Sequence, residues 1–185
     1  MMNKCQSWLF LVEGDMEKAL LKELKEHHNL IIKDIKIFNL WNSKLNSLLP
    51  IIKPNMGVVV VFDTDTLTRI EEFKKNIALL SRKVKSLCLI QQNKNFEDAL
   101  CFSCGCTQQI LFKHFLPKGT GALSTSEFKR NFMSCKQRIV KLGKINFSHQ
   151  RIWSKHTHIL PELSQYEQYH IEFSLLVKTL SKLKK

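Results

Sequence analysis

Residues 57–66 read GVVVVFDTDT, an apolar run that ends in two aspartates separated by one residue. A short run of this kind, rich in valine, is typical of a strand that is buried on both faces of a parallel sheet. Charged side chains are excluded from such a strand, so Asp63 and Asp65 are expected at its carboxyl end. In open parallel sheets that end is where ligands bind.

Apolar runs and amphipathic segments alternate around this strand. Further strands are predicted at residues 7–12, at 30–40 near an edge of the sheet, and at 84–90. Leucines and isoleucines spaced by three and four predict helices at 16–28 and 66–82, and a short helix is expected at 42–49. The first 92 residues therefore predict an α/β fold, with a mostly parallel four-stranded sheet flanked by helices.

Beyond residue 92 the pattern is helical and basic. Short helices are expected at 96–102 and 108–115, followed by a loop at 118–121. A capping box, Ser124 with Glu127, predicts a helix that continues to about Leu142. We therefore expect two parts, a catalytic core at 1–92 and a helical, basic extension at 93–185 that packs on the core.

Another helix is expected from Pro161 to the end of the chain. Its apolar side chains recur at steps of three and four, the spacing of a packing seam. The seam consists of Tyr166, Tyr169, Phe173, Leu176, Leu180 and Leu183. The segment 161–183 is expected either to dock on its own chain or to pair with a second subunit, as a homodimer or with a partner protein.

The charge of the chain is strongly positive and uneven. There are 29 Lys and Arg against 16 Asp and Glu, a formal net charge of +13. Most of the excess lies after residue 98, and nine basic residues between 118 and 155 face a single acid, Glu127. Such an imbalance predicts a polyanionic partner, DNA or RNA, although a lysine-rich proteome would also produce it.

Cysteine usage and hydropathy bear on localisation. The six cysteines stand at irregular spacings, and the apolar run at 8–12 is too short for a signal peptide. No run reaches the roughly 18 apolar residues of a membrane-spanning helix. These features predict a cytoplasmic protein with reduced thiols and no membrane partner.

A second carboxylate group is predicted beside the aspartates. Glu13 follows the first strand, and in a parallel sheet it would meet Asp63 and Asp65 at one edge. Glu17 lies in the first turn of the following helix. Carboxylates without nearby His or Cys suit Mg²⁺ or Mn²⁺, one ion or two. The competing interpretation of Asp65 is a cap for the helix expected at 66–82.

The pair of segments LFLVEGDMEKALL (9–21) and VVVVFDTDT (58–66) resembles the TOPRIM domain, the catalytic fold of topoisomerases, bacterial primases, small ribosomal RNA maturases and OLD-type nucleases. Glu13-Gly14 and Asp63-Thr64-Asp65 match the two motifs of that domain. The segment EGDME (13–17) is most similar to the OLD-type and RloB-type branch, which is implicated in defence against phage. The resemblance covers residues 7 to about 92.

The resemblance also implies roles for individual residues. Glu13 would serve acid/base or metal-bound chemistry, and Asp63 and Asp65 would hold Mg²⁺. The segment QQNKNFEDALCF (91–102) is similar to an Asn-x-x-Phe-Glu segment of RloB-type proteins, which makes Glu97 a further candidate ligand. The alternative for Glu97 is an acid that only stabilises a helix start.

Hydrolysis of a phosphodiester also calls for a cation near the leaving oxygen. Lys129 and Lys155 are the candidates for this catalytic role. The residues expected to contact nucleic acid are Lys118, Lys129, Arg130, Lys136, Arg138, Lys141, Lys144, Arg151 and Lys155. Trp153 is expected either to touch a base or to pack in the core.

The sequence thus predicts a metal-dependent nuclease that acts on DNA or RNA. It contains no P-loop, and its only tyrosines, Tyr166 and Tyr169, lie in the apolar seam, which disfavours a topoisomerase. One alternative is a non-catalytic nucleic-acid-binding or regulatory protein with the same fold. Another is a phosphatase or nucleotidyl transferase that acts on a small phosphorylated substrate.

Overall fold

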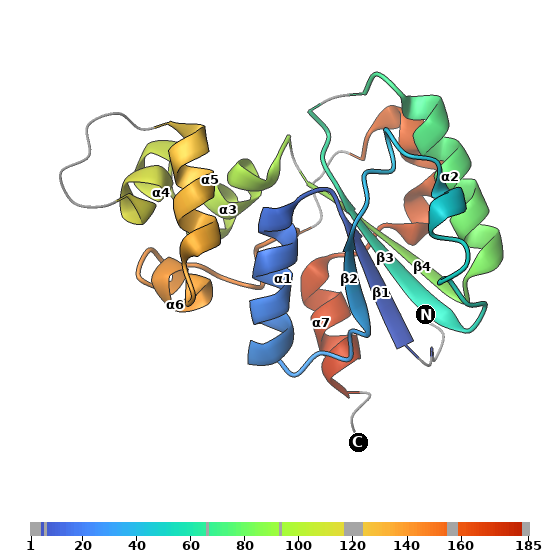
Figure 1. Cartoon of the computed structure of the whole chain (residues 1–185), viewed down its shortest axis with the longest axis horizontal. Coiled ribbons are helices and arrows are strands. Elements are labelled where there is room, and N and C mark those ends of the chain that lie inside the picture. Colours follow the sequence, from blue (N-terminus) through green and yellow to red (C-terminus); the bar gives the residue numbers. More distant parts are fainter. Residues whose placement is uncertain are drawn as a thin grey trace.

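The computed structural model describes residues 5, 7–65, 67–92, 94–116, 124–154 and 159–182. They form a mixed α/β fold around a four-stranded parallel sheet of order β2-β1-β3-β4, as predicted (Figure 1). The strands are β1 (Ser7–Val12), β2 (Asp34–Ile37), β3 (Met56–Phe62) and β4 (Ser86–Gln91).

Helices cover both faces of the sheet. One face carries α1 (Asp15–His27) and α7 (Phe173–Lys182), and the other carries α2 (Ile70–Lys83) with the 3-10 helix η2 (Pro161–Tyr169) (Figure 1). From β1 the chain moves to one edge of the sheet, and from β3 it moves to the other. Right-handed crossovers in opposite directions place their helices on opposite faces, so the sheet is doubly wound.

The valine run is buried on both faces because each face has its own core. Val59 and Val61 pack in the cluster beneath α1 and α7, whereas Val58 and Val60 pack in the cluster beneath α2. All seven residues of β3 are buried. A central strand between two helical layers has no solvent-facing side, which explains the absence of polar alternation in its sequence.

A close contact locks β1 against β3. Trp8 stands opposite Gly57 in the parallel register and is 1% exposed. A Cβ atom at Gly57 would lie 2.4 Å from the indole of Trp8. The glycine that opens the valine run is therefore required for space, and the indole covers the strand where the side chain is missing.

A separate helical group stands beyond the carboxyl end of the sheet (Figure 1). Its helices are α3 (Phe96–Cys104), α4 (Gln108–Phe115), α5 (Thr125–Ser134) and α6 (Arg138–Gly143). The first two agree with the short helices predicted from the sequence. The loop expected at 118–121 lies outside the described residues.

The single helix predicted from Ser124 to Leu142 is wrong, because the chain breaks after Ser134 and restarts at Arg138. The Ser124 half of the predicted capping box is present: the amide of Glu127 donates to Ser124 Oγ over 3.2 Å, while Glu127 Oε2 accepts from the same hydroxyl at 3.2 Å. The second helix, α6, begins beside Glu23 of α1. The Glu23 carboxylate accepts from Arg138 Nη1 at 2.7 Å and from the Ile139 amide at 3.0 Å. This contact between distant segments cannot be recognised from local sequence.

The continuous C-terminal helix is also wrong. After η2 the chain forms a bridge from His170 to Leu89 at the β4 edge, and α7 follows on the opposite face. Tyr166 and Tyr169 are partly buried against the cluster beneath α2, whereas Phe173, Leu176 and Leu180 of α7 pack beside α1. The predicted seam is thus divided between two faces and buried in its own chain. Leu183 lies outside the described residues.

Three further boundaries differ from the sequence prediction. The edge strand is four residues long, the helix expected at 42–49 is one 3-10 turn, and α2 begins at Ile70 instead of residue 66. Asn39 Oδ1 accepts the amides of Trp41 and Asn42, a turn that competes with a helix. In the part of the chain that is described, no helix has both the length and the apolarity to cross a bilayer.

Gly57→Ala is expected to destabilise the fold by about 3 kcal/mol, because the new Cβ would collide with a fully packed indole that cannot move aside. Urea denaturation would measure the change in the free energy of unfolding. Gly143→Ala is the matched control, since a Cβ there meets no atom within 4 Å. The control should be neutral or stabilising by up to about 1 kcal/mol, and equal effects of both substitutions would contradict the packing argument.

Candidate functional site

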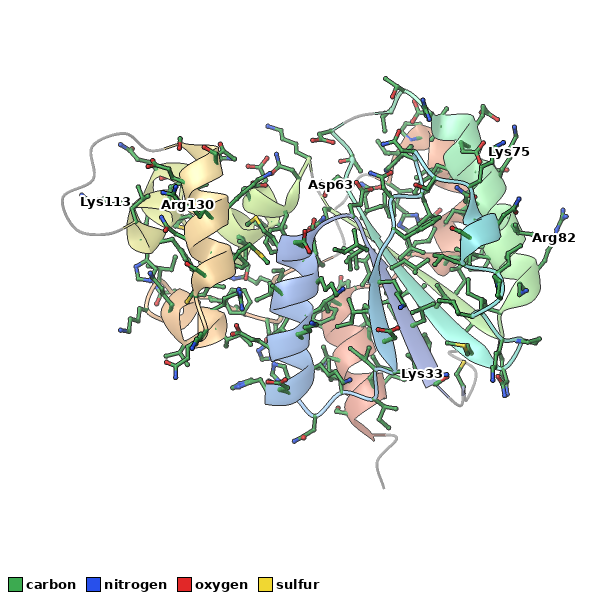
Figure 2. The ribbon with its side chains drawn as sticks, viewed as in Figure 1. Lys33, Asp63, Lys75, Arg82, Lys113 and Arg130 are labelled. Atoms are coloured by element: carbon green, nitrogen blue, oxygen red, sulfur yellow. The ribbon has the colours of Figure 1, made fainter. Side chains whose placement is uncertain are left out.

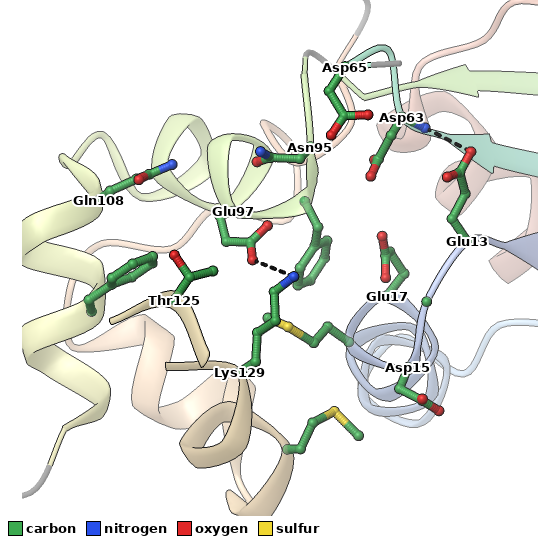
Figure 3. Close-up of a pocket in the computed structure, with 15 residues that line it drawn as sticks. Glu13, Asp15, Glu17, Asp63, Asp65, Asn95, Glu97, Gln108, Thr125 and Lys129 are labelled. Carbon is green, nitrogen blue, oxygen red and sulfur yellow. Dashed lines mark hydrogen bonds and ion pairs between the residues drawn. The ribbon is translucent and has the colours of Figure 1, made fainter. Parts of the chain in front are cut away.

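A cavity of about 710 Å³ opens between the carboxyl end of the sheet and the helical group (Figure 3). It collects all five predicted carboxylates and one of the two predicted catalytic lysines. These lining residues are Glu13, Glu17, Asp63, Asp65, Glu97 and Lys129. Figure 2 shows Asp63 at the end of the sheet that faces the helical group.

The place of the cavity follows from the topology. Glu13 follows β1 and Asp63 follows β3, the two central neighbours in the sheet. The connections that leave these two strands turn to opposite faces, which leaves a crevice between their carboxyl ends. The strand order therefore brings together residues that are 50 positions apart in the chain.

Glu13 is held by two neutral donors. The Asp63 amide donates to its Oε1 at 3.2 Å, and Asn39 Nδ2 donates to its Oε2 at 2.9 Å. Burial raises the pKa of Glu13 to about 7, and the Asp63 hydrogen bond only partly opposes this rise. The nearby Glu17 carboxylate raises the pKa further. The side chain is thus fixed in direction while its charge remains unfavourable.

Asp63 has the most unfavourable charge of the group. Burial raises its pKa to about 8, and repulsion from Glu17 and Glu13 contributes next. Burial also raises the pKa of Glu17, which is 4% exposed. The neutral amide of Gln92 donates to Glu17 Oε1 at 3.2 Å and also to Asp63 Oδ1. Carboxylates this close repel one another, and a divalent cation between them would relieve that repulsion.

The sequence offered two interpretations of Glu97, a ligand in the site or an acid at a helix start, and its position is compatible with both. It lies in the first turn of α3, which Asn95 caps by accepting from the Asp98 amide, and it also lines the cavity. Its Oε1 is 3.3 Å from Lys129 Nζ, an ion pair between α3 and α5. The pair places the ammonium group of Lys129 at the wall opposite Asp63 and Glu13 (Figure 3).

Gly14 of the Glu-Gly motif is needed for space. Its backbone is extended, with φ −141°, which any residue can adopt. A Cβ atom at this position would lie 2.9 Å from Glu17 Oε2. The missing side chain therefore lets the Glu17 carboxylate approach the end of β1, where Glu13 stands.

Thr64, the middle residue of the Asp-Thr-Asp motif, has a structural role. Thr64 Oγ1 donates to the Gln92 carbonyl and accepts from the Lys94 amide, each at 3.0 Å, and so ties the end of β3 to the end of β4. Helix α2 begins at Ile70, and Arg69 occupies its N-cap position. The alternative role of Asp65 as a helix cap is therefore wrong, and Asp65 lines the cavity instead.

The donor set suits a hard cation. Among the described residues no group of three or more His, Cys, Asp or Glu side chains is already arranged to hold a metal ion. The described lining of the cavity nevertheless includes the five predicted carboxylates and neither His nor Cys, and the pKa values of Glu13, Glu17 and Asp63 are raised by burial and by repulsion from neighbouring carboxylates. This chemistry fits Mg²⁺ or Mn²⁺ and does not fit a zinc site.

Several residues that were expected to bind nucleic acid have structural partners. Arg138 pairs with Glu23, and Arg151 donates to the Ser103 carbonyl at 2.9 Å. Lys141 Nζ lies 4.8 Å from the centre of the Phe115 ring. The Arg138 pair anchors the helical group to α1, and the other two contacts lie within the C-terminal part of the chain, which explains part of its positive charge without a ligand.

The other basic candidates are more accessible. Lys136 and Lys144 are exposed, and Arg130 has only a long 3.8 Å contact with Glu127. Lys118 and Lys155 lie outside the described residues. Positive charge is also present far from the cavity, since Figure 2 shows Lys75 and Arg82 on α2. At the cavity wall formed by α5, the basic side chain of Lys129 meets the acidic side chain of Glu97.

Sequence reasoning missed Gln92, and of the two roles that it left open for Trp153 the structure shows packing in the core. Trp153 is 2% exposed and donates from Nε1 to Gln92 Oε1 at 2.6 Å, so it packs in the core and does not offer a face to a base. A buried glutamine directly after a strand end was the available signal for Gln92. Its partners lie 29, 61 and 75 residues away, which no local pattern reveals.

The fold and the cavity define a class: a doubly wound α/β protein with a carboxylate site at its topological switch point. Comparison with protein-family models, with curated proteins and with solved structures finds no match to this chain. Any statement about function therefore depends on the geometry of the site and on the motifs that build it.

Asp63→Asn is expected to stabilise the metal-free protein in alkaline solution. The pKa of Asp63 rises from 3.8 to about 8 on folding, so near pH 4 the folded chain is protonated at Asp63, the unfolded chain is only partly ionised, and the cost to the wild type is small. Between these values the unfolded chain ionises at Asp63 and gains solvation, whereas the folded chain keeps the proton, so stability falls as the pH rises. At about pH 8.5 the variant should gain on the order of 1–3 kcal/mol.

Urea denaturation in EDTA at about pH 4 and about pH 8.5 would measure this difference. Glu71→Gln, at an exposed carboxylate of α2, is the control and should change stability by less than about 0.5 kcal/mol at either pH. A gain for Asp63→Asn that is the same at both pH values would refute the electrostatic explanation.

Proposed function

We propose that this chain is a Mg²⁺- or Mn²⁺-dependent nuclease of TOPRIM type that hydrolyses phosphodiester bonds in DNA or RNA. The observation that carries the proposal is the meeting of five carboxylates and Lys129 in one cavity at the switch point of the sheet. A site of this composition is suited to bring a cation and a phosphate together.

The carboxylates divide naturally into ligands and a base. Glu17, Asp63 and Asp65 would hold one or two divalent ions, with Glu97 at the opposite wall. When bound, such an ion lowers the pKa of an attacking water and offsets the charge on the phosphate. Glu13, oriented by Asn39 and with a pKa of about 7, is suited to accept the proton of that water near neutral pH.

Lys129 is suited to stabilise the leaving oxygen. Its ammonium group reaches the cavity from α5 and is held there by Glu97. A positive charge fixed before the reaction needs no reorganisation when negative charge develops. The exposed residues Lys136, Lys144 and Arg130 on the same helical group would hold the nucleic-acid backbone.

The TOPRIM assignment is supported by the order of the motifs along the sheet. Glu13-Gly14 follows β1 and Asp63-Thr64-Asp65 follows β3 of a four-stranded parallel sheet, as the resemblance requires. By the same resemblance we propose a cytoplasmic effector in antiviral defence, with its activity controlled by a partner or a signal.

A non-catalytic nucleic-acid-binding or regulatory protein is the second candidate. One observation favours it: the amide of Gln92 already occupies an oxygen of both Glu17 and Asp63, and no ready-made group of three ligands is present among the described residues. A chain that kept the fold without chemistry would bind nucleic acid and leave it intact.

The direct test incubates the purified protein with labelled single- and double-stranded DNA and RNA in Mg²⁺, Mn²⁺ or EDTA. Cleavage should require a metal, fall about 100-fold or more in Asp63→Ala, and fall by about 10²–10³ in Lys129→Ala. Glu71→Ala and Lys75→Ala, which remove the same charges on α2, should cleave like the wild type.

Cleavage that persists in EDTA or in Asp63→Ala would contradict the nuclease. Salt-sensitive binding without any cleavage, unchanged by Asp63→Ala, would favour the binding protein.

Gly14→Ala provides a separate prediction, because the atom that a new Cβ would meet is the flexible end of a side chain. The fold should lose less than about 1 kcal/mol, while the displaced Glu17 carboxylate should lower cleavage by about 10–100-fold. Urea denaturation and the cleavage assay measure the two effects. Gly143→Ala is the control, and cleavage that is equally reduced in both variants would remove the special role of Gly14.

A further inference from the structure

Gln92 is the most deeply buried polar residue beside the cavity. It follows β4 directly and is 0% exposed. Its backbone N–H donates to the backbone carbonyl of Phe62 at 2.8 Å, and its backbone carbonyl accepts from Thr64 Oγ1 at 3.0 Å. The backbone of Gln92 is therefore fixed on both sides by the end of β3.

The side chain of Gln92 joins three segments of the chain. Its Nε2 donates to Glu17 Oε1 at 3.2 Å and to Asp63 Oδ1, and its Oε1 accepts from Trp153 Nε1 at 2.6 Å. An indole N–H can only donate, so the atom that faces Trp153 must be the amide oxygen. The orientation of the amide is thus decided by chemistry, and its NH₂ group must face the two carboxylates.

Trp153 is itself held rigidly. Its ring lies against Phe173 of α7 in an edge-on contact, with 5.1 Å between centroids, and 6.3 Å from the ring of Phe96 of α3. Its carbonyl accepts from the Phe173 amide at 3.2 Å. The φ angle of Trp153 is +50°, a left-handed conformation that a bulky residue adopts only when its surroundings impose it.

We propose that Gln92, oriented by Trp153, is a positioning residue that selects which oxygen of Glu17 and of Asp63 is presented to a divalent cation. This inference rests on the proposed function. Gln92 engages one oxygen of each carboxylate, which leaves Glu17 Oε2 and Asp63 Oδ2 for a ligand in the cavity. The two acids come from α1 and from the end of β3, and the shared amide fixes their separation.

The choice of a neutral donor matters for this role. A lysine or arginine at position 92 would hold the same two oxygens but would also cancel charge that attracts the cation. An amide provides two N–H groups and leaves the full negative charge of the site in place. Partners of this kind, one step removed from the metal, commonly change metal affinity by about 10–100-fold when they are removed.

The experiment compares three variants for Mn²⁺ binding to metal-free protein by isothermal titration calorimetry. Gln92→Met keeps the length of the side chain and removes its hydrogen bonds, and Trp153→Phe keeps an aromatic ring but removes the N–H together with part of the indole. Asn76→Leu is the control, because Asn76 is also a buried amide with three hydrogen bonds, but neither it nor its partners at residues 40–45 line the cavity.

Gln92→Met should weaken Mn²⁺ binding about 10–100-fold, and Trp153→Phe about threefold or more. Asn76→Leu should lower the melting temperature while the affinity stays within about twofold of the wild type. If Gln92→Met fails to fold, Trp153→Phe decides the question. Unchanged affinity in a folded Gln92→Met variant, or in Trp153→Phe when it alone folds, would overturn the proposal.

Tryptophan fluorescence adds a second measurement, which would not change on metal binding if Gln92 and Trp153 had only a structural role. Mg²⁺ should change the emission of the wild type through Glu17, Asp63 and Gln92, and the change should disappear in Trp153→Phe. A Mg²⁺-dependent change that persists in Trp153→Phe would overturn the coupling. If the wild type binds neither ion, the proposed function fails; if it binds and cleaves while Gln92→Met does so equally well, only the positioning role fails.

Discussion

Repulsion among buried carboxylates is the constraint on which the rest of the structure depends. Glu13, Glu17 and Asp63 share one partly buried region, and the pKa of each is raised, first of all by its burial. Such a group opposes folding, so the surrounding structure must hold it by other means. The valine strand provides a rigid support that is buried on both faces, and a glycine provides the space in which the acids can approach one another.

The helical group completes this arrangement from the other side. It brings Lys129 to the cavity through its ion pair with Glu97, and it is anchored to α1 by Arg138 and Glu23. The anchor lies on the same helix whose first turn carries Glu17. One helix therefore positions a carboxylate at its beginning and fixes the opposite wall of the cavity further along.

The sequence was sufficient for those features that depend on local pattern and on the geometry of parallel sheets. An unbroken valine run predicted the central strand, and the rule for strand ends then brought Glu13 to Asp63. The pattern failed where a distant contact decides the outcome. Glu23 breaks the helix predicted through residue 142, and the periodicity of the C-terminal segment could not reveal that its two halves cover opposite faces of the sheet.

The donors around the carboxylates explain why the site remains ready for a cation. Asn39 and Gln92 are neutral amides, so they fix the directions of Glu13, Glu17 and Asp63 without reducing their charge. Had these positions been basic, ion pairs would have replaced repulsion, the pKa values would have fallen, and affinity for a further cation would have been lost. Lys129, the lysine among the described residues that line the cavity, is paired with Glu97 at the far wall. The separation of the neutral donors from the Lys129 ammonium group keeps negative charge on one side of the cavity and positive charge on the other, which is the arrangement that the proposed metal and phosphate sites require.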